Sequence, residues 1–267
     1  MRRTSVRVIA VVAAVLSMLT LGLSLTSAGA GVRRAQPAAP SHRRPVIFVH
    51  GFTGSGAQFE TQALRFTSNG YAPKLIAVHE YDSLFGVETR DQVFARLDQR
   101  IADLLRASHA DQVDLLGHSL GTTLMQAYLN STPARAAKVA HYVNLDGATA
   151  TSPPGGVPTL AIWGMGSTTR KIVGAANLYF TKQTHVQVVT SRETFEQIYT
   201  FFTGKEPTTT NVLPEHNINL AGRAQIFPQN TGFDGTLEIF QVNGATGKRL
   251  DNNPVATFAL HGDGAWG

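Results

Sequence analysis

From Pro45 onward, short apolar runs alternate with amphipathic stretches, and this alternation constrains the fold of the 267-residue chain more than any other feature. Continuous apolar runs of about four residues are typical of strands buried on both faces of a parallel sheet. Such runs occur at Val46–Val49, Leu75–Val78, Val113–Leu116, Tyr142–Leu145, Leu160–Trp163 and Asn177–Phe180. Apolar residues at helical spacing predict helices around 88–107, from Ser119 to about Asn130, and after Ser191 as N-cap. Strands that alternate with helices predict an α/β fold with a mostly parallel, doubly wound sheet and helices on both faces.

The pattern changes near residue 205. A Pro/Thr-rich connection, KEPTTTN at 205–211, is followed by segments with strand character at 219–227, 236–242 and 255–260, separated by glycine-containing turns. No helical periodicity is present there, which predicts an all-β segment. We therefore expect an α/β domain at 45–206, and a small or incomplete β-rich C-terminal segment at 207–267.

Residues 1–30 have the three-part pattern of a secretory signal peptide. Three arginines precede an apolar run at 8–25, and the A-G-A of 28–30 matches a cleavage site. We expect a Sec-type signal and a secreted protein, or one retained at the cell envelope. An uncleaved anchor is the alternative, because the apolar run is almost long enough to span a bilayer. Residues 31–44 are rich in Pro, Ala and Arg and predict a disordered tether.

The net charge of the chain is +5, but the basic excess lies in its first part. Residues 1–44 hold seven arginines and no acidic residue, and the remainder has 16 basic against 18 acidic residues. A remainder with a charge of −2 shows no basic footprint for nucleic acid. The chain has no cysteine, which excludes thiol catalysis and cysteine-bound metal sites. We expect no cofactor, no metal site and no nucleotide site, with structural Ca²⁺ in the Asp/Asn-rich turns near 251–253 and 263 left open.

Residues 113–121 read VDLLGHSLG, so that Gly117-x-Ser119-x-Gly121 follows a predicted strand and begins a predicted helix. A serine in a sharp strand-to-helix turn is strained, and the positions two residues away must be glycine to avoid clashes. Its hydroxyl is exposed beside a helix N-terminus, whose dipole favours a developing negative charge. We predict that Ser119 is a nucleophile in an elbow formed by Gly117, His118 and Gly121. An ordinary glycine-rich turn with a capping serine is the alternative.

The first predicted strand runs into HGFTGSG at 50–56, the place where a loop is expected to supply a second oxyanion donor. We assign the oxyanion hole to the backbone N–H groups of Phe52 and Leu120. The glycines of this loop would let its backbone approach a substrate. The alternative is a loop that is merely flexible. We expect His50 to be structural and not catalytic.

A nucleophilic serine needs an acid and a base, which in this architecture follow it in the order Asp/Glu, then His. Four histidines come after the serine: His141, His185, His216 and His261. His185 follows the last core strand, in a loop expected above the C-terminal edge of the sheet, and we predict that it is the base. Asp146 is the only acidic residue between Ser119 and His185. We predict that it accepts a hydrogen bond from His185 and stabilises the imidazolium.

Five segments of this chain resemble the α/β-hydrolase superfamily, in particular secreted bacterial and archaeal lipases and carboxylesterases with a C-terminal β-domain. They are PVIFVHGFTGSGAQFE (45–60), VDLLGHSLGT (113–122), AAKVAHYVNLDG (136–147), PTLAIWG (158–164) and NLYFTKQTHVQVVTSRETF (177–195). The resemblance implies the α/β-hydrolase fold, with Asp146 as the acid and His185, in its T-H-V-Q stretch, as the base. It also implies that the C-terminal segment begins a β-sandwich associated with lipid or substrate binding.

One stretch departs from the relatives that carry a helical lid. Here Tyr81–Val87 runs almost directly into the next predicted helix, so we expect no large lid and an open site. An open site favours short or medium acyl chains, or bulky substrates that can reach an exposed serine.

Together these features predict a secreted serine ester hydrolase, a carboxylesterase or lipase, that acts through Ser119, Asp146, His185 and an acyl-enzyme intermediate. We expect a small-molecule or lipid ester as substrate and no protein partner, and we leave association with a lipid surface open. The alternatives are another acyl hydrolase or an acyltransferase on the same fold, or a non-catalytic lipid-binding protein on a hydrolase scaffold.

Overall fold

The computed structural model describes residues 43–166, 168–215 and 220–267. The expected signal peptide and nearly all of the expected tether lie outside these residues. Among the helices that are described, none is both long enough and apolar enough to cross a membrane. The α/β core and the C-terminal segment belong to one compact unit.

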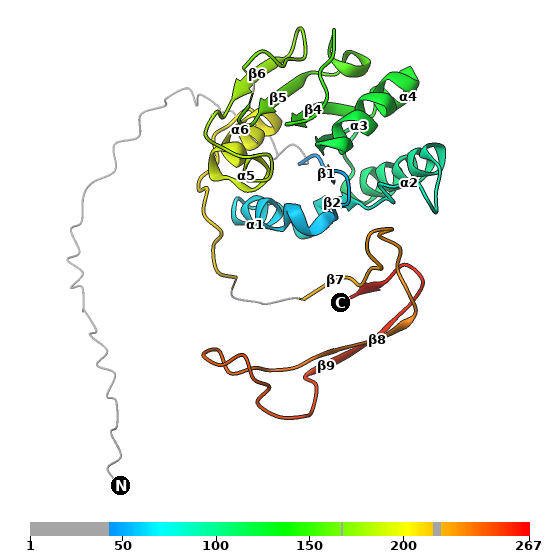
Figure 1. Cartoon of the computed structure of the whole chain (residues 1–267), viewed down its shortest axis with the longest axis vertical. Helices are drawn as coiled ribbons and strands as arrows, with labels where there is room; N and C mark the ends of the chain where they lie inside the picture. Colours follow the sequence, from blue (N-terminus) through cyan, green and yellow to red (C-terminus); the bar gives the residue numbers. More distant parts are fainter. Residues whose placement is uncertain (1–42, 167, 216–219) are drawn as a thin grey trace, which may run out of the picture. The chain divides into compact units, whose positions relative to one another are not determined.

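Six parallel strands form the central sheet, in the order β2-β1-β3-β4-β5-β6 (Figure 1). Their bounds are β1 Val46–Val49, β2 Ile76–His79, β3 Val113–His118, β4 Val139–Leu145, β5 Thr159–Trp163 and β6 Ala176–Tyr179. All residues of β1, β3 and β5 are buried, as their apolar sequences predict. The predicted α/β fold and its six strands are confirmed, with the bounds of β1 as predicted and those of the other strands shifted by at most three residues.

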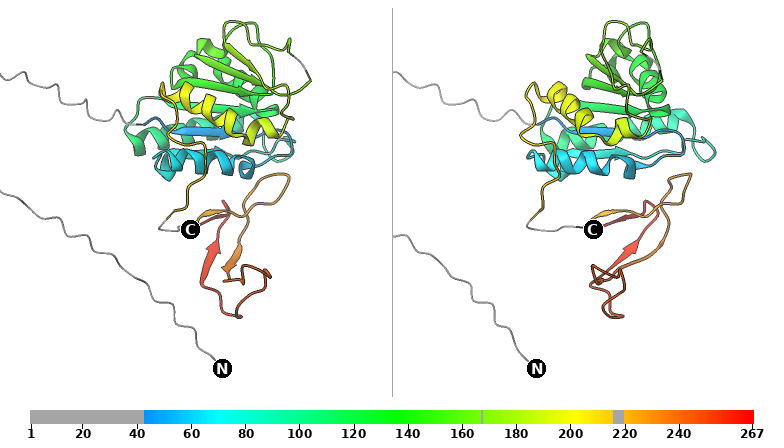
Figure 2. Two further views of the ribbon diagram at one scale, coloured as in Figure 1. Left: turned by 90° about the vertical axis from the view of Figure 1, so that its left-hand side faces the viewer. Right: turned by 60° about the vertical axis from the view of Figure 1, so that its left-hand side comes forward.

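Helices lie on both faces of this sheet, which makes it doubly wound (Figure 1, Figure 2). Their bounds are α1 Glu60–Ser68, α2 Arg90–Ser108, α3 Leu120–Ser131, α4 Pro133–Ala136, α5 Gln187–Thr190 and α6 Arg192–Thr203. Short 3₁₀ turns occur at η1 Gly56–Phe59, η2 Pro73–Leu75 and η3 Pro154–Gly156. The three predicted helices correspond to α2, α3 and α6, and the predicted N-cap Ser191 accepts a hydrogen bond from Thr194 N–H.

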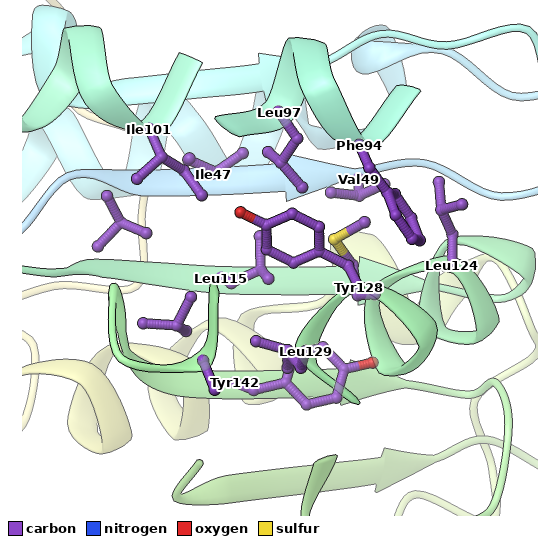
Figure 3. Close-up of a cluster of buried hydrophobic side chains, with 14 of the residues drawn as sticks. Ile47, Val49, Phe94, Leu97, Ile101, Leu115, Leu124, Tyr128, Leu129 and Tyr142 are labelled. Atoms are coloured by element: carbon purple, nitrogen blue, oxygen red, sulfur yellow. The ribbon is translucent and has the colours of Figure 1, made fainter. Parts of the chain in front are cut away.

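Each face of the sheet has its own apolar core. On one face, strand residues such as Ile47 and Leu115 pack against Leu97 of α2 and Tyr128 of α3 (Figure 3). On the other face, Phe66 of α1 joins α5, α6 and the alternate residues of the same strands. Successive strand side chains point to opposite faces, so continuous apolar strands are what two covered faces require. The two cores hold the strand ends rigidly, and these ends carry the predicted site.

The C-terminal segment is confirmed as β-structure with short antiparallel pairs. β8 (Gly235–Ile239) pairs with β9 (Ala256–Leu260), and β7 (Gly222–Arg223) pairs with β10 (Ala265–Trp266) (Figure 1). The strand expected at 219–227 is wrong in length, because within the described residues 220–227 only β7 forms. Residues after β7 turn instead, with Asn230 N–H donating to the Ile226 carbonyl at 2.8 Å, and Pro228 has no N–H to donate to a ladder.

The connection from β2 to α2 is short and internally bonded. Asp82 is fully buried, and its carboxylate accepts hydrogen bonds from the backbone N–H groups of Leu84, Gly86 and Val87 at 2.6 to 3.0 Å. Burial raises the pKa of the Asp82 carboxyl, but the three N–H donors lower it by more, so the net pKa lies below its ordinary value. The carboxylate therefore holds the connection between β2 and α2 as a compact loop.

We expect Asp82→Asn to lower the free energy of unfolding at pH 7 by about 2 kcal/mol, because the N–H groups lose a charged acceptor. The folded pKa of Asp82 is below its unfolded value of about 3.9. The stabilisation is therefore complete above about pH 5 and is lost as the pH falls through the folded pKa. Urea unfolding at pH 7, 5 and 3 measures this, with exposed Asp111→Asn as the control. A difference between wild type and Asp82→Asn that stays constant with pH would contradict the assignment.

Candidate active site

The strand order brings the predicted site residues to one edge of the sheet. β3, β4 and β5 are neighbours whose register pairs His118 with Leu145 and Leu145 with Ile162. Backbone bonds continue this register past the strands: Ser119 N–H donates to the Leu145 carbonyl at 3.0 Å, and Asp146 N–H donates to the Ile162 carbonyl at 2.8 Å. Parallel strands end at the same edge, so Ser119 and Asp146 lie on adjacent loops there.

Ser119 has the backbone of a strained elbow, with φ 53° and ψ −121° between β3 and α3. A non-glycine residue in this region persists only where the surroundings impose it. The surroundings are tight: a Cβ on Gly121 would lie 2.4 Å from the His50 carbonyl oxygen, and a Cβ on Gly117 would lie 2.8 Å from the Gly121 carbonyl oxygen. Both glycines of the motif are therefore required by close backbone approach, which is the physical reason for the sequence pattern.

Asp146 and His185 meet as a hydrogen-bonded pair. His185 Nδ1 lies 2.6 Å from Asp146 Oδ2, and the carboxylate is 5% exposed while the imidazole is 49% exposed. Because the carboxylate only accepts, the Nδ1 proton donates to it, and Nε2 is left as the free basic nitrogen. His185 lies in the loop between β6 and α5, as the sequence predicts.

Three donors surround the Asp146 carboxylate and set its charge state. Burial raises the pKa of this carboxyl, but the bond from His185, the Gly164 N–H at 3.1 Å and the Arg170 charge at 2.9 Å together bring it below its ordinary value. Asp146 is thus a carboxylate at neutral pH, as a partner for an imidazolium must be.

Arg170 is a residue of this site that the sequence analysis missed. Its guanidinium donates to Asp146 Oδ1 and to the Gly147 carbonyl, and its Cζ lies 4.7 Å from the centre of the Trp163 ring. Arginine suits such a place because its planar group bonds and stacks at once. The sequence shows only that Arg170 lies in the loop after the strand that ends at Trp163. That loop contains no acidic residue, so nothing in the sequence indicates which carboxylate Arg170 would bond.

His118, predicted as part of the elbow, lies against His185, the predicted base. Its ring is 4.5 Å from the His185 ring, His118 Nε2 lies 3.0 Å from the His185 carbonyl, and Gln58 Nε2 lies 3.0 Å from Nδ1. Burial lowers the pKa of His118 to about 4. The ring is therefore neutral, with Nε2–H donating to the backbone of His185 and Nδ1 accepting from Gln58.

The predicted oxyanion donors lie beside the serine. A Cβ on Gly51 would be 2.8 Å from Ser119 Cβ, so the loop after β1 abuts the elbow. Leu120 is the first residue of α3, and its N–H belongs to those that a helix leaves free. In the loop, Gly54 N–H donates to the Gly51 carbonyl at 3.1 Å and Thr53 N–H to Ser83 Oγ at 2.7 Å. Phe52 N–H has no acceptor among the described residues.

One bond of the predicted constellation is not formed. Ser119 Oγ and His185 Nε2 have no hydrogen-bond partner among the described residues, so no bond joins the serine to the histidine here. Catalytic hydrogen bonds are often long in unliganded sites and tighten when substrate binds. The structure thus brings together Asp146 and His185 directly, and places Ser119, Phe52 and Leu120 around the same edge.

Comparison with known proteins gives the class. A family model described as the alpha/beta hydrolase family matches residues 46–216, and a model described as the lipase C-terminal domain matches residues 216–267. Since the first model covers more than half of the chain, this chain belongs to the alpha/beta hydrolase family and is a hydrolase with a lipase-like C-terminal segment. The predicted resemblance to this superfamily is confirmed.

Solved structures and curated proteins were compared as well. The chain is similar to a predicted CIB-like hydrolase from Thermoplasma acidophilum, at 18% identity over 61% of this chain and 87% of that one, with a TM-score of 0.42. It is also similar to lipase B of Aspergillus fumigatus, at 14% identity over 65% of this chain and 56% of that one, with a TM-score of 0.47. No curated protein matches the chain.

We expect Arg170→Ala to lower kcat for a p-nitrophenyl ester by about 10- to 100-fold, because Asp146 loses a donor that orients it toward His185. Arg170→Lys keeps the charge but not the planar, two-site donation, and we expect an intermediate value. Steady-state kinetics measure both variants, and Lys171→Ala, an exposed neighbour, is the control. Equal rates for Arg170→Ala and the control would remove Arg170 from the site.

Proposed function

We propose that this chain is a secreted serine ester hydrolase, a carboxylesterase or lipase with an open site. The observation that carries the proposal is the convergence of Ser119, in a strained elbow at a helix N-terminus, with an Asp146–His185 pair joined at 2.6 Å. Strained backbone of this kind is retained at functional sites. The family match and the lipase-like C-terminal segment support a hydrolase of this type.

The proposed reaction has two stages, acylation of Ser119 and hydrolysis of the acyl-enzyme, and both use the same residues. His185 Nε2 takes the proton of Ser119 Oγ as the oxygen attacks the ester carbonyl, and the N–H groups of Phe52 and Leu120 stabilise the oxyanion. The intermediate collapses, the alkoxide leaves, and His185 returns the proton to form the alcohol. Water, deprotonated by His185, then attacks the acyl-enzyme and releases the acid and free Ser119.

An ester substrate with short or medium chains fits the surroundings of the serine. The β2–α2 connection is compact, and the imidazole of His185 is half-exposed. Large apolar side chains are exposed on loops that follow the strands beside the site. They are Phe52, Met165 and Val186. Apolar side chains beside an open serine favour an acyl group or an apolar ester surface over a charged substrate.

Export from the cell is part of the proposal. The pattern of residues 1–30 supports removal of a Sec-type signal peptide, and the near-neutral charge of the remainder suits a protein that is not held by nucleic acid.

We expect Ser119→Ala to lower ester turnover on the order of 10⁴-fold or more, because the nucleophile is lost while the fold is kept. A fluorophosphonate probe should label the wild type at Ser119 and leave the variant unlabelled, as read by mass spectrometry. Ser152→Ala, at an exposed serine, is the control and should behave as wild type. Undiminished activity or labelling in Ser119→Ala would end the proposal.

A series of p-nitrophenyl esters from acetate to palmitate tests the open site. We expect kcat/KM to be highest for short or medium chains and to fall toward palmitate, because no lid covers a long acyl chain and excludes water from it. Tributyrin should be hydrolysed without an abrupt rise in rate at its solubility limit. A strong preference for palmitate, or such a rise, would contradict the open site while leaving the serine chemistry in place.

A further inference from the structure

The C-terminal segment places one buried side chain against the predicted oxyanion loop. Asn230 is 6% exposed, and its Nδ2 lies 2.7 Å from the Gly54 carbonyl, 3.1 Å from His50 Nε2 and 3.4 Å from the Tyr81 carbonyl. The backbone of Asn230 is left-handed, with φ 55°, a conformation that asparagine tolerates better than most residues. Buried polar atoms are expected to be bonded, and all three contacts of this Nδ2 are to residues of the core.

The contacts admit one assignment of protons. Backbone carbonyls only accept, so the Asn230 atom that faces Gly54 and Tyr81 is the NH₂ group. His50 Nε2 faces this NH₂ group at 3.1 Å and the Tyr81 backbone N–H at 3.4 Å, and both are donors, so Nε2 is the accepting nitrogen of the ring. The proton of the buried His50 ring is then on Nδ1, which lies 2.9 Å from the Gly51 carbonyl and donates to it. The position of Glu80 is consistent with this assignment. Its Oε2 lies 3.3 Å from His50 Nε2 but has no hydrogen-bond partner among the described residues, as expected when Nε2 carries no proton to donate.

The Gly51 carbonyl belongs to the same peptide group as the Phe52 N–H. A peptide group is planar and trans, so its C=O and N–H point in opposite directions, and holding one aims the other. The Gly51 oxygen is held by His50 Nδ1–H and by Gly54 N–H. Asn230 contacts both residues that donate to the Gly51 oxygen, because its Nδ2 bonds the His50 ring and the Gly54 carbonyl. The orientation of the predicted oxyanion donor therefore depends on a side chain that lies 176 residues after Gly54 in the sequence.

We propose that Asn230 is a positioning residue for the oxyanion loop, so that the C-terminal segment completes the reaction site of the core and does not serve only as a separate binding module. This proposal rests on the serine hydrolase function proposed above. Asn230 keeps the His50 proton on Nδ1. Without its NH₂ group, Nε2 keeps only the longer bond from the Tyr81 N–H at 3.4 Å, the Glu80 carboxylate draws the proton to Nε2, and the Gly51 carbonyl loses a donor.

The test compares three full-length variants. Asn230→Gly removes the amide but still accepts the left-handed backbone, and Asn230→Asp keeps the shape but replaces the donor by an acceptor. Asn253→Gly makes the same change at an exposed asparagine of the same segment and is the control. Active-site titration with a fluorophosphonate gives the concentration of competent enzyme, so that kcat and KM refer to folded protein.

We expect Asn230→Gly and Asn230→Asp to lower kcat by about 10- to 100-fold with KM changed by less than about twofold, because a misplaced oxyanion donor weakens an interaction that forms only in the transition state. The control should match wild type. Long-range ¹H–¹⁵N spectra should place the His50 proton on Nδ1 in the wild type and on Nε2 in Asn230→Gly. This second measurement does not need turnover.

Two results would overturn the proposed role of Asn230 while leaving the proposed function in place. The first is an active wild type together with an unchanged kcat in Asn230→Gly. This result would overturn the proposal even if the variant unfolds at a lower temperature, because loss of a purely structural residue lowers stability without lowering kcat. The other is a His50 proton that stays on the same nitrogen in wild type and variant. A wild type that neither hydrolyses esters nor reacts with the fluorophosphonate would instead overturn the proposed function, and the role of Asn230 in it would be lost as well.

Discussion

The parallel pairing of β1, β3, β4 and β5 is the constraint on which the site depends. Four neighbouring strands in one register end at one edge, and the loop that follows each strand carries part of the site. Covering both faces with helices buries all residues of β1, β3 and β5 and most of β4. This burial fixes the register, because a shift by one residue would exchange the two apolar faces. The strained φ of Ser119 and the close approach of Gly121 to the His50 carbonyl are tolerated because the cores on both faces hold the strand ends.

At this edge of the sheet, the neighbours of Asp146 and His118 set the charge state of each group. Asp146 is held as a carboxylate by His185, Gly164 and Arg170, and burial at the same time keeps His118 neutral. A neutral ring against the base can donate to the His185 backbone without adding a positive charge that would oppose the imidazolium. Asp146 therefore bonds the side chain of His185, the predicted base, and the neutral His118 ring bonds the backbone carbonyl of His185.

The C-terminal segment has little regular structure, and much of its surface is exposed. Among its described large apolar side chains only Leu260 is buried, so the segment has little core of its own. Among the described residues of the segment, Asn230 is the one buried polar side chain, and it is bonded to core backbone and to His50. This contact gives the segment a connection to the site that is independent of any affinity for lipid.

The sequence by itself determined the class of fold, because alternating apolar strands and amphipathic helices have few stable arrangements, and it indicated Ser119, Asp146 and His185 through local motif, chain order and elimination. It did not indicate α1, whose apolar residues are few and whose burial comes from packing of Phe66 on the sheet. It also could not indicate Arg170 or Asn230. Arginine and asparagine occur on most loops, and only the tertiary structure decided that these two lie against a buried carboxylate and a buried histidine. The bond from Arg170 to Asp146 spans 24 positions and the bond from Asn230 to His50 spans 180, and no local pattern in a chain encodes such distances.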